Sequence, residues 1–565
     1  MRGVVRRVAG LVRRYRVDRR LPPTILSFFR TTQALRRRHR ADVRAAQRHA
    51  PIGAGTAPAD APIRRLADRR VVVAGPTSNS SHDAALDQAE WFVAVCERAG
   101  VRPFVVERLD DRLRFGLRLD DRRTALVGLG DAATAGRHLR WRDRNADGLV
   151  ALADAPDDRR ARVAREWTIF ESTEWGDRAT GPERGVVVTF YDIGSSGEYE
   201  LIGTRGHDRF DRRCTDTVER IWGREFPGNS AYPIGASLAH FEEPIDIVYT
   251  WVDGADPVWI EAFRSTAAEH GRDVDEAALN AARYRSRDEL RYSLRSIAEH
   301  CGWVNHVWVV TAGQRPSWLV EDDRLSVVDH ADILPADAIP TFNSHAIESA
   351  LHHIDDLAEH FLYVNDDMLV ARSLRPETFF TSNGLAKVFQ SGAPVPGVED
   401  EHTQAVDTGA RRGRELLLER FGRTVIDKPL HAPYPNRRSA LFDLEREFPE
   451  IVKRTRHSRF RSATDLSIAA SFAQHYAVAT GRAVFGELIG DYAYVESDRL
   501  RWSLDRVLYG DDIDTFCLNE THAVDGDHGD RDAMIDEFFE QLLPVPSPWE
   551  QPPSREGDAA RATID

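Results

Sequence analysis

The sequence predicts a multidomain α/β protein, and three features of its pattern support this. The chain has 565 residues, which exceeds the usual size of one compact core. Short runs rich in β-branched and aromatic residues alternate with longer stretches whose apolar residues recur at helical spacing. Acidic residues follow directly after two of the expected strands. Since strands that alternate with helices form mainly parallel sheets, we expect ligands beyond the carboxyl ends of these strands.

The first 50 residues form a basic arm. They carry 15 Arg and two acidic residues, a formal charge of +13 within a chain of net charge −14. Residues 2–16 place Val and Leu at helical spacing, which is typical of an amphipathic helix on an anionic membrane surface and equally of a solvated tail. No long apolar run follows, so we expect a cytoplasmic protein with peripheral contact to the inner membrane. The acidic remainder argues against a nucleic acid as partner.

Composition also suggests where the domains begin and end. The four cysteines are far apart and form no CxxC pair, so neither a disulfide framework nor a zinc site is expected. Residues 51–62 are rich in Pro, Gly and Ala, as linkers are. The predicted division is a basic arm and linker (1–62), an N-terminal α/β domain (63–238), a catalytic domain (239–545) and a flexible tail (546–565).

The N-terminal domain is expected to hold a mainly parallel sheet. A helix is predicted over 83–99, with Gly100 ending it. The strands are predicted at 71–73, 104–106, 126–128 and 186–191. We find no catalytic group of residues in this domain.

The catalytic domain shows a clearer βαβ pattern. Its strands are predicted at 245–251, 307–310 and 361–364, and its helices at 287–299, 345–360 and 464–479. Ser462 and Asp465 are spaced to form a capping box at the start of the last helix. Two of the strands run into acidic turns, the first containing Asp253 and Asp256 and the other being Asn365-Asp366-Asp367. These turns are the candidate sites.

Asp366 and Asp367 are the best metal candidates. Adjacent carboxylates after a buried strand can supply oxygen ligands to Mg²⁺ or Mn²⁺ and leave positions open for a diphosphate. A solvated turn that satisfies its own backbone has the same pattern. Asp253 is a weaker candidate of the same kind, whereas Asp256 fits better as an Asx turn before Pro257. Trp251 is placed to stack on a base or ribose, although a Trp in a strand more often packs in the core.

Basic residues supply the remaining candidates. Arginine suits phosphate because its planar fork donates two parallel hydrogen bonds, and four arginines flank or lie on the 287–299 helix: Arg285, Arg287, Arg291 and Arg295. They suit an ion-paired helix face equally well. His431 is a candidate general base because an imidazole titrates near neutral pH. Arg461 precedes the 464–479 helix, where it is placed to stabilise a phosphoryl group or to be an ordinary surface residue. These residues alone do not separate glycosyl transfer from sugar-phosphate transfer.

Six runs of the sequence resemble the conserved blocks of the Stealth family. They are IDIVYTWVDGADPVW (245–259), the run from RYRSRDELRYS to PSWL (283–319), PTFNSHAIESALHHIDDLAEHFLYVNDDMLV (340–370), KPLHAPYPNRRSALFDLEREFPE (428–450) with RFRSATDLSIAASFAQHYA (459–477), and CLNE (517–520). The resemblance covers about 240–520 and does not include the basic arm or the N-terminal domain. In CLNE, Glu520 stands where the family more often has Asp, which weakens a metal role there.

The resemblance implies a Rossmann-like, glycosyltransferase-A-like nucleotide-binding core with a helical C-terminal part. It implies an enzyme of exopolysaccharide or capsule synthesis that uses Mg²⁺ or Mn²⁺ and transfers a sugar 1-phosphate, such as N-acetylhexosamine 1-phosphate, from a UDP-sugar to a carbohydrate hydroxyl. The active-site groups it implies are Asp253, Asp367, His431 and Arg461, and the weaker ones are Glu289, Arg291 and Asn519. With Trp251 and Arg285, which the residue pattern alone suggests, these last three are the predicted nucleotide-sugar contacts. The alternatives are a metal-dependent glycosyltransferase and a non-catalytic scaffold at the membrane.

Overall fold

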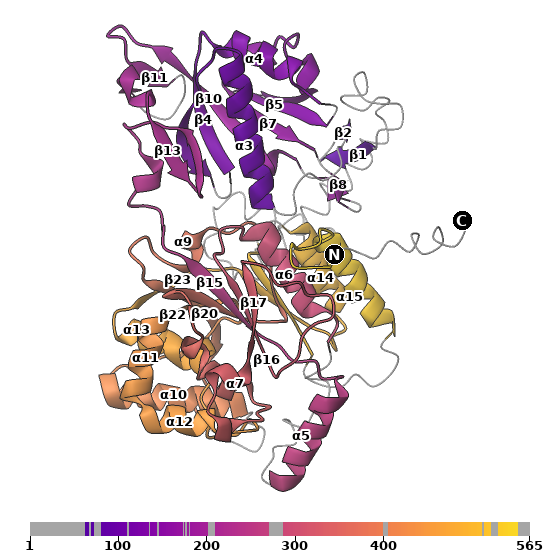
Figure 1. The fold of residues 1–565 in the computed structure, drawn as a ribbon, viewed down its shortest axis with the longest axis vertical. Helices are drawn as coiled ribbons and strands as arrows, with labels where there is room; N and C mark the ends of the chain where they lie inside the picture. The colour runs from indigo at the N-terminus through magenta and orange to yellow at the C-terminus, as the bar shows by residue number, and fades with distance from the viewer. Residues whose placement is uncertain are drawn as a thin grey trace, which may run out of the picture.

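The computed structural model describes residues 63–551, apart from 67–68, 73–80, 110–111, 135, 144–145, 173, 176–177, 180, 202–208, 271–285, 399–404, 511–512 and 521–528. The basic arm therefore lies outside the described residues. Two units are stacked along the long axis of the molecule, each with its own sheet and hydrophobic core (Figure 1). The predicted α/β class is confirmed, whereas the finer glycosyltransferase-A-like assignment stays a prediction.

The N-terminal unit is a mixed sheet covered by two helices, α3 (Ser81–Arg98) and α4 (Arg122–Asp131). The central path of the sheet is β12-β11-β10-β7-β5-β6, with β4 beside β10 and β3 beside β4. The strands are β3 (Phe104–Leu109), β4 (Arg112–Arg118), β5 (Arg137–Asp143), β6 (Ala146–Ala151), β7 (Glu166–Glu171), β10 (Val186–Ile193), β11 (Tyr199–Leu201) and β12 (Arg209–Phe210). Three short two-stranded sheets accompany it: β1 (Ile63–Leu66) with β2 (Arg69–Val72), β8 (Glu174–Trp175) with β9 (Arg178–Ala179), and β13 (Val218–Ile221) with β14 (Arg224–Pro227).

Two predictions for this unit are wrong. Only the β4–β10 pair of the main sheet is parallel, because hairpins such as β3–β4 and β5–β6 join neighbouring strands where crossover helices were expected. Residues 126–128 lie in α4, where Ala125, Leu126 and Leu129 are buried at helical spacing. The strand expected at 71–73 is present as β2, which pairs with β1 beside the main sheet. The helix that ends at Gly100 is confirmed, and this glycine has a φ of 74°.

The second unit is built on the predicted parallel sheet. Its order is β17-β16-β15-β18-β22, and only β22 runs antiparallel. The strands are β15 (Ile245–Thr250), β16 (Val307–Thr311), β17 (Leu325–Asp329), β18 (His360–Asn365) and β22 (Tyr434–Arg437). Thr250 pairs with Asn365, so the carboxyl ends of β15 and β18 lie side by side. Both acidic turns therefore start from the same edge of the sheet.

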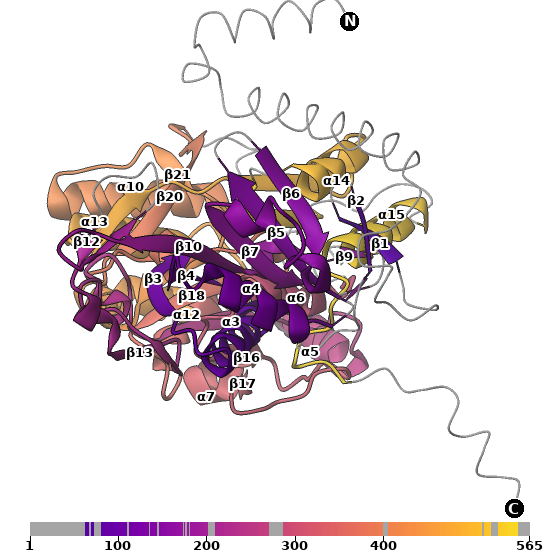
Figure 2. The ribbon, with the colours of Figure 1, turned by 90° about the horizontal axis from the view of Figure 1, so that it is seen from above.

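Helices and two small sheets surround this core. The small sheets are β19 (Met368–Val370) with β25 (Thr515–Asn519) and β24 (Gly490–Tyr494), and β21 (Asp427–Pro429) with β20 (Ala386–Pro394) and β23 (Ala483–Gly486). The helices are α5 (Pro257–His270), α6 (Glu289–His300), α7 (His330–Ile333), α8 (Ser344–Glu348), α9 (Pro376–Phe379), α10 (Ala405–Phe421), α11 (Arg438–Glu447), α12 (Pro449–Arg456), α13 (Ala473–Ala479), α14 (Leu500–Tyr509) and α15 (Gly529–Leu542). Seen from above, α10 and α13 lie on one side of the N-terminal sheet and α14 and α15 on the other (Figure 2).

Two predicted helices are shorter than the sequence suggested. The 345–360 segment is helical only in α8 and in a 3₁₀ turn at 351–353. There Arg438 donates to the carbonyl oxygens of His352, Ile354 and Leu357, so side-chain hydrogen bonds replace those of a continuing helix.

The 464–479 helix begins later, with a π-helical turn at 468–472 that leads into α13. Asp465 does not cap it. Its carboxylate accepts from the side chain of Asn343 at 2.8 Å and from the backbone N–H of Ser462 at 2.9 Å. The buried Asp465 therefore fixes a loop against α8, which a single sequence does not reveal.

Ion pairs join the two units. Arg108 of β3 binds Glu242 at 2.7 Å, and Arg184 binds Glu299 of α6. His82 of α3 packs closely on Gly302. A β-carbon added at residue 302 would lie 2.1 Å from the Cβ of His82. The N-terminal unit thus contacts the helix that carries part of the candidate site. None of the helices in the described ranges combines the length and apolar composition needed to cross a bilayer.

The start of the predicted flexible tail is packed. Trp549 is buried, and Glu550 accepts from Arg291 at 2.7 Å and from Arg295 at 2.8 Å. The backbone of Gln551 donates to Trp318. Residues 546–551 therefore belong to the second unit, because they neutralise two arginines of α6. The remainder of the tail, 552–565, lies outside the described residues.

This packing predicts a stability effect. Replacing Glu550 by Ala leaves the buried Arg295 without its main counter-charge, so the free energy of unfolding should fall by about 3 kcal/mol. Replacing Glu321, which pairs with Arg315 at the surface, should cost less than about 1 kcal/mol. Urea unfolding of both variants measures the difference. Equal, small losses would show that residues 546–551 contribute little to the fold.

Candidate functional site

The acidic turn after β18 holds two carboxylates in a crowded setting. Asp366 and Asp367 lie between β18 and β19 and are half-buried. Burial raises the pKa of Asp366 well above its usual range, and the negative charges of Asp367 and Glu289 raise it further. Hydrogen bonds from the backbone of the turn offset this in part. The carboxylates therefore repel one another, which favours either a proton or a cation between them.

Glu289 is the third member of this acid cluster. It begins α6, is 8% exposed and accepts from the backbone N–H of Arg287 at 2.5 Å. Burial raises its pKa, and the charge of Asp367 adds to the shift. Sequence reasoning placed Glu289 among the nucleotide-sugar contacts, but the structure places it within electrostatic reach of the acidic turn. A carboxylate there serves a cation better than it serves a phosphate.

One carboxylate oxygen of Asp367 accepts a hydrogen bond, and the other has no hydrogen-bond partner. The thiol of the buried Cys517 donates to its Oδ2 at 3.2 Å, and its backbone carbonyl accepts from Leu518. The β19–β25 ladder, which pairs Met368 with Cys517, produces this contact. Oδ1 is buried without a hydrogen-bond partner and lies 3.9 Å from Nε2 of His431. This gap between an acid and an imidazole is the most distinctive feature of the turn.

His431 reaches the acidic turn because β22 pairs with β18. Its Nδ1 lies 2.8 Å from the hydroxyl of Tyr434, and its ring meets that of Tyr492 edge to face, with centroids 5.6 Å apart. Burial raises the pKa of Tyr434 well above its usual range, so this phenol stays neutral. The imidazole is therefore fixed at Nδ1, and its Nε2 faces Asp367.

Glu348 is a site residue that the sequence reasoning missed. It ends α8, is 4% exposed and accepts from the hydroxyl of Ser467 at 2.9 Å. Burial raises its pKa to about 7, while the positive charges of Arg461 and His431 oppose that shift. A charged residue inside the apolar run AIESAL was the available signal. A buried carboxyl that titrates near neutral pH is suited to proton transfer.

Arg461 lies in the same neighbourhood. Its guanidinium donates to the hydroxyl of Ser344 at 2.6 Å and acts electrostatically on Glu348 and Tyr363. The structure therefore places Arg461 beside Ser344 and near Glu348, whereas His431 is the residue that reaches Asp367. A cation here can balance the buried acids or hold an anionic ligand.

The site fits a divalent cation with oxygen ligands. Ligand atoms of Asp367, His431 and Cys517 all lie within 4.8 Å of one another, and Asp367 Oδ1 is the buried oxygen without a partner. Mg²⁺ and Mn²⁺ prefer carboxylate oxygens to a thiol. Asp366 and Asp367 are therefore the expected ligands, and Cys517 stays a hydrogen-bond donor to Asp367.

A second cluster fits a metal less well. His352 and His353 both contact Oε2 of Glu445, at 2.7 and 2.9 Å, while Arg456 binds the other oxygen at 2.7 Å. A metal-bound imidazole needs an acceptor for its second nitrogen, and Nδ1 of His352 is buried with no partner. The guanidinium already balances the carboxylate. This cluster is a hydrogen-bonded network that joins α11 to the segment after α8.

The turn after β15 is rigid. Gln314 accepts from the backbone N–H of Asp253 and donates to its carbonyl, each at 3.0 Å, and also donates to Asp256 at 2.9 Å. Asp256 caps the start of α5, and its pKa is lowered by the Gln314 bond and by backbone donors, which agrees with the Asx-turn reading. Asp253 and Trp251 are half-buried, and Trp251 packs against the core.

Other predicted contacts are placed differently. Arg291 binds Glu550 and Arg295 is buried against the same carboxylate, so both act as ion-paired structural residues of α6. Arg287 binds Glu520 at 2.8 Å, which gives that residue a structural partner. Asn519 ends β25, the strand that pairs beside the acidic turn. Arg285 lies outside the described residues.

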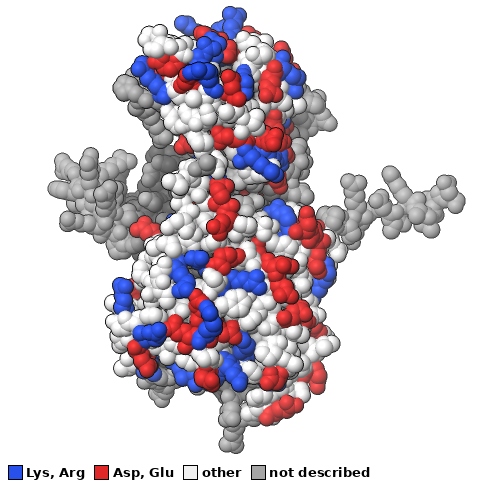
Figure 3. Space-filling model, turned by 60° about the vertical axis from the view of Figure 1, so that its left-hand side comes forward, with Lys and Arg blue, Asp and Glu red and all other residues white. Residues whose placement is uncertain are grey.

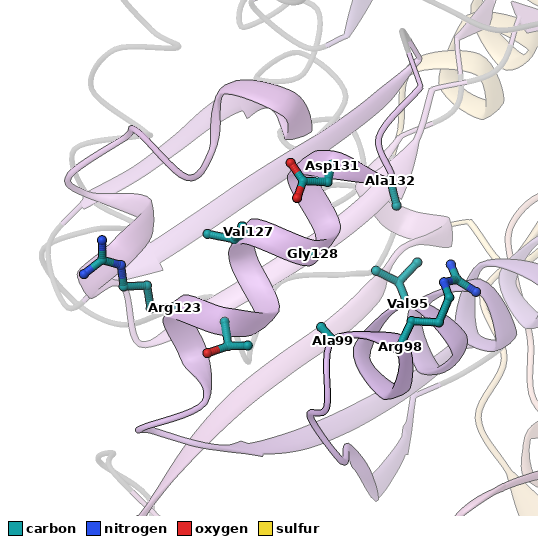
Figure 4. A pocket seen from close by; sticks show the side chains of 9 residues that line it. Val95, Arg98, Ala99, Arg123, Val127, Gly128, Asp131 and Ala132 are labelled. Carbon is teal, nitrogen blue, oxygen red and sulfur yellow. The ribbon is translucent and has the colours of Figure 1, made fainter.

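The N-terminal unit has an open depression of about 620 Å³ between α3 and α4. Arg98 and Arg123 lie on opposite sides of it, with Val95 and Val127 between them (Figure 4). Asp131 is its one lining carboxylate, so it offers no acid–base pair. Over the face shown in Figure 3, the described residues mix acidic and basic side chains in both units. The candidate site therefore lies in the second unit.

The fold and the site define an α/β protein with a carboxylate–imidazole centre beside a parallel sheet. Comparison with protein families identifies four segments of this unit: Stealth protein conserved region 1 at 243–271, region 2 at 283–388, region 3 at 430–478 and region 4 at 505–561. All four occur in order along the chain. The protein therefore belongs to the Stealth family.

Several curated proteins are similar to this chain. An exopolysaccharide phosphotransferase of Streptomyces coelicolor is 48% identical over 313 residues, which are 54% of this chain and 52% of that protein. One of Nocardia farcinica is 39% identical over 54% of this chain and 61% of its own length. The exopolysaccharide phosphotransferase CpsY of Mycobacterium tuberculosis is 36% identical over 60% of this chain and 63% of its own. The chain thus spans between about half and two thirds of these relatives.

The buried Glu348 predicts a pH-dependent stability difference. Its carboxyl must ionise inside the protein above pH 7, whereas in the unfolded chain it ionises near its ordinary pKa of 4.5, so folding loses stability as the pH rises between these values. Glu348→Gln removes this penalty and should be more stable than the native protein by about 3 kcal/mol at about pH 8. The free energies of unfolding of the two proteins should be nearly equal at about pH 4.

Urea unfolding at both pH values measures this difference. Glu261→Gln, at an exposed acid of α5, is the control and should change the stability at neither pH. A Glu348→Gln variant that is less stable than the native protein at high pH would show that the carboxylate is fully compensated by its surroundings.

Proposed function

We propose that this protein transfers a sugar 1-phosphate from a UDP-sugar to a carbohydrate hydroxyl in exopolysaccharide synthesis. The observation that carries the proposal is the gap between His431 Nε2 and the unpartnered oxygen of Asp367, 3.9 Å away, within an acid cluster. The names of the similar proteins support phosphotransfer. We take N-acetylhexosamine as the donor sugar, as the family resemblance implies.

His431 acts as the general base. In the neutral tautomer that this requires, Nδ1 carries the hydrogen and donates to the Tyr434 oxygen, and Nε2 accepts the proton of the acceptor hydroxyl. That oxygen forms a bond to the phosphorus that bears the sugar, and the bond from this phosphorus to the bridging oxygen breaks. UMP leaves with the electron pair of that bond.

The acid cluster and Arg461 stabilise charge in this reaction. Asp366 and Asp367, with Glu289 nearby, would hold Mg²⁺ or Mn²⁺, which supplies charge neutralisation for the diphosphate. Arg461, which donates to Ser344, would bind phosphoryl oxygens through its guanidinium. Glu348, whose pKa is about 7, buffers the positive charge that develops on His431. Asp253 and Trp251, at the end of β15, would contact the nucleotide.

The released nucleotide tests the reaction. A panel of UDP-sugars is incubated with Mg²⁺ and an acceptor glycan mixture, and the products are separated by chromatography. UMP is expected, since the bond from the sugar-bearing phosphorus to the bridging oxygen is the one that breaks. Release of UDP would identify a glycosyltransferase instead, and no metal-dependent turnover by the full chain or by residues 60–551 would favour a scaffold.

His431→Ala should lower kcat by at least about 100-fold and leave the affinity for the UDP-sugar nearly unchanged, because the base acts in the chemical step. His457→Ala, at a half-exposed histidine of the same unit, is the matched control and should keep full activity. Steady-state kinetics with isothermal titration of UDP-sugar separates the two effects. A His431→Ala variant with native kcat would remove this imidazole from the mechanism.

A further inference from the structure

A cavity of about 540 Å³ adjoins the candidate site. His431 and Tyr434 belong to its lining, so it borders the imidazole that faces Asp367. Its other walls come from β20, α10, β21, α13, β24 and the π-helical turn at 468–472. None of these elements carries the acidic turns. The cavity therefore meets the reaction centre at His431, and neither Asp366 nor Asp367 belongs to its lining.

The charged groups of the cavity do not cancel. Lys428 pairs with Asp407, and Asp491 pairs with Arg506 at 3.1 Å. Arg414 donates to the carbonyl oxygens of Val395 and Pro396, both at 3.3 Å, and among the described residues no carboxylate forms an ion pair with it. A positive charge thus remains in the wall of the cavity, and a guanidinium recognises phosphate or carboxylate through paired hydrogen bonds.

His475 supplies a second polar group. It lines the cavity from α13, is 5% exposed, and its Nε2 has no hydrogen-bond partner. Burial lowers its pKa to about 4, so the ring is neutral at physiological pH. A buried polar atom without a partner is costly, and a ligand hydroxyl in the cavity would satisfy it.

Aromatic rings extend from His431 toward the surface. Tyr492 lies 5.6 Å from His431 between ring centroids, and Tyr494 lies 4.8 Å from Tyr492. Both project from the same face of β24, and Tyr494 is 47% exposed. Sugar rings present C–H faces that pack against aromatic rings, while their hydroxyls need polar partners. Because this row of rings lies beside His431, the proposed general base, it fits a short glycan better than it fits a nucleotide.

We propose that this cavity binds the acceptor glycan, and that the acceptor carries an anionic group, phosphate or carboxylate, near the sugar whose hydroxyl reacts. The inference rests on the proposed function, because it is the role of His431 as base that requires the acceptor beside it. Arg414 binds the anion, His475 binds a hydroxyl, and Tyr492 and Tyr494 support successive sugar rings. The UDP-sugar occupies the other side of the centre, at the ends of β15 and β18.

Binding without turnover tests this assignment. The full chain, free of metal and donor, is titrated calorimetrically with three probes: maltotetraose as a neutral glycan, a hyaluronan tetrasaccharide as a carboxylate glycan, and a tetrasaccharide containing one sugar phosphodiester. At least one anionic probe should bind more tightly than maltotetraose, and the better of the two identifies the anion. Equal affinities for all three, or no binding at millimolar concentrations, would overturn the proposal.

Variants locate the binding. Arg414→Gln should lower the affinity for the anionic probe about 10-fold, because a charge-assisted hydrogen bond is lost, and should leave the affinity for UDP unchanged. Arg423→Gln, at an exposed arginine just beyond α10, is the matched control and should change neither. Tyr494→Ala should weaken all binding probes alike, whereas Tyr232→Ala, at an exposed tyrosine of the N-terminal unit, should not.

These outcomes separate the two proposals. Loss of UDP binding in Arg414→Gln would assign the cavity to the donor and contradict its role as acceptor site. Thermal unfolding of each variant shows that it is folded. Release of UDP in place of UMP would refute sugar-phosphate transfer, yet it would leave the glycan titrations, which involve no chemistry, fully interpretable.

Discussion

Electrostatic repulsion among three carboxylates is the constraint on which the site depends. Asp366, Asp367 and Glu289 lie within mutual reach where solvent is largely excluded, and burial together with the neighbouring charges raises the pKa of Asp366. Such a cluster is unfavourable unless a proton or a cation compensates it. A protein fold keeps groups of this kind mainly where they perform chemistry. A divalent cation would supply the positive charge that compensates this cluster.

The sheet determines how these groups meet. Parallel pairing of β15 with β18 aligns the two acidic turns, and antiparallel pairing of β22 with β18 brings His431 to the second of them. The β19–β25 ladder adds Cys517, whose thiol fixes one oxygen of Asp367 and leaves the other available. Residues far apart in the chain therefore converge through backbone pairing.

The sequence predicted the parts of this arrangement that depend on local pattern. The parallel sheet of the second unit, α6 and the strand-end position of Asp366 and Asp367 follow from hydrophobic spacing alone. The sequence did not predict what depends on tertiary contacts. Hydrogen bonds from Arg438 end the helix expected after Ser344. Arg291 forms an ion pair with Glu550. Glu348 was overlooked because its raised pKa arises from burial, which a single sequence does not display. The nearness of His431 to Asp367 rested on the family resemblance, since no spacing rule connects residues so distant.

Locating a bound cation tests the central claim most directly. Crystals of the protein soaked with Mn²⁺ would give an anomalous difference map in which the metal is identified without reference to activity. We expect one strong peak within coordination distance of Asp367 Oδ1, with Asp366 as a further ligand and His431 nearby. A peak at His352, His353 and Glu445 with none at the acidic turn would contradict the claim that the carboxylate cluster is built to hold a cation.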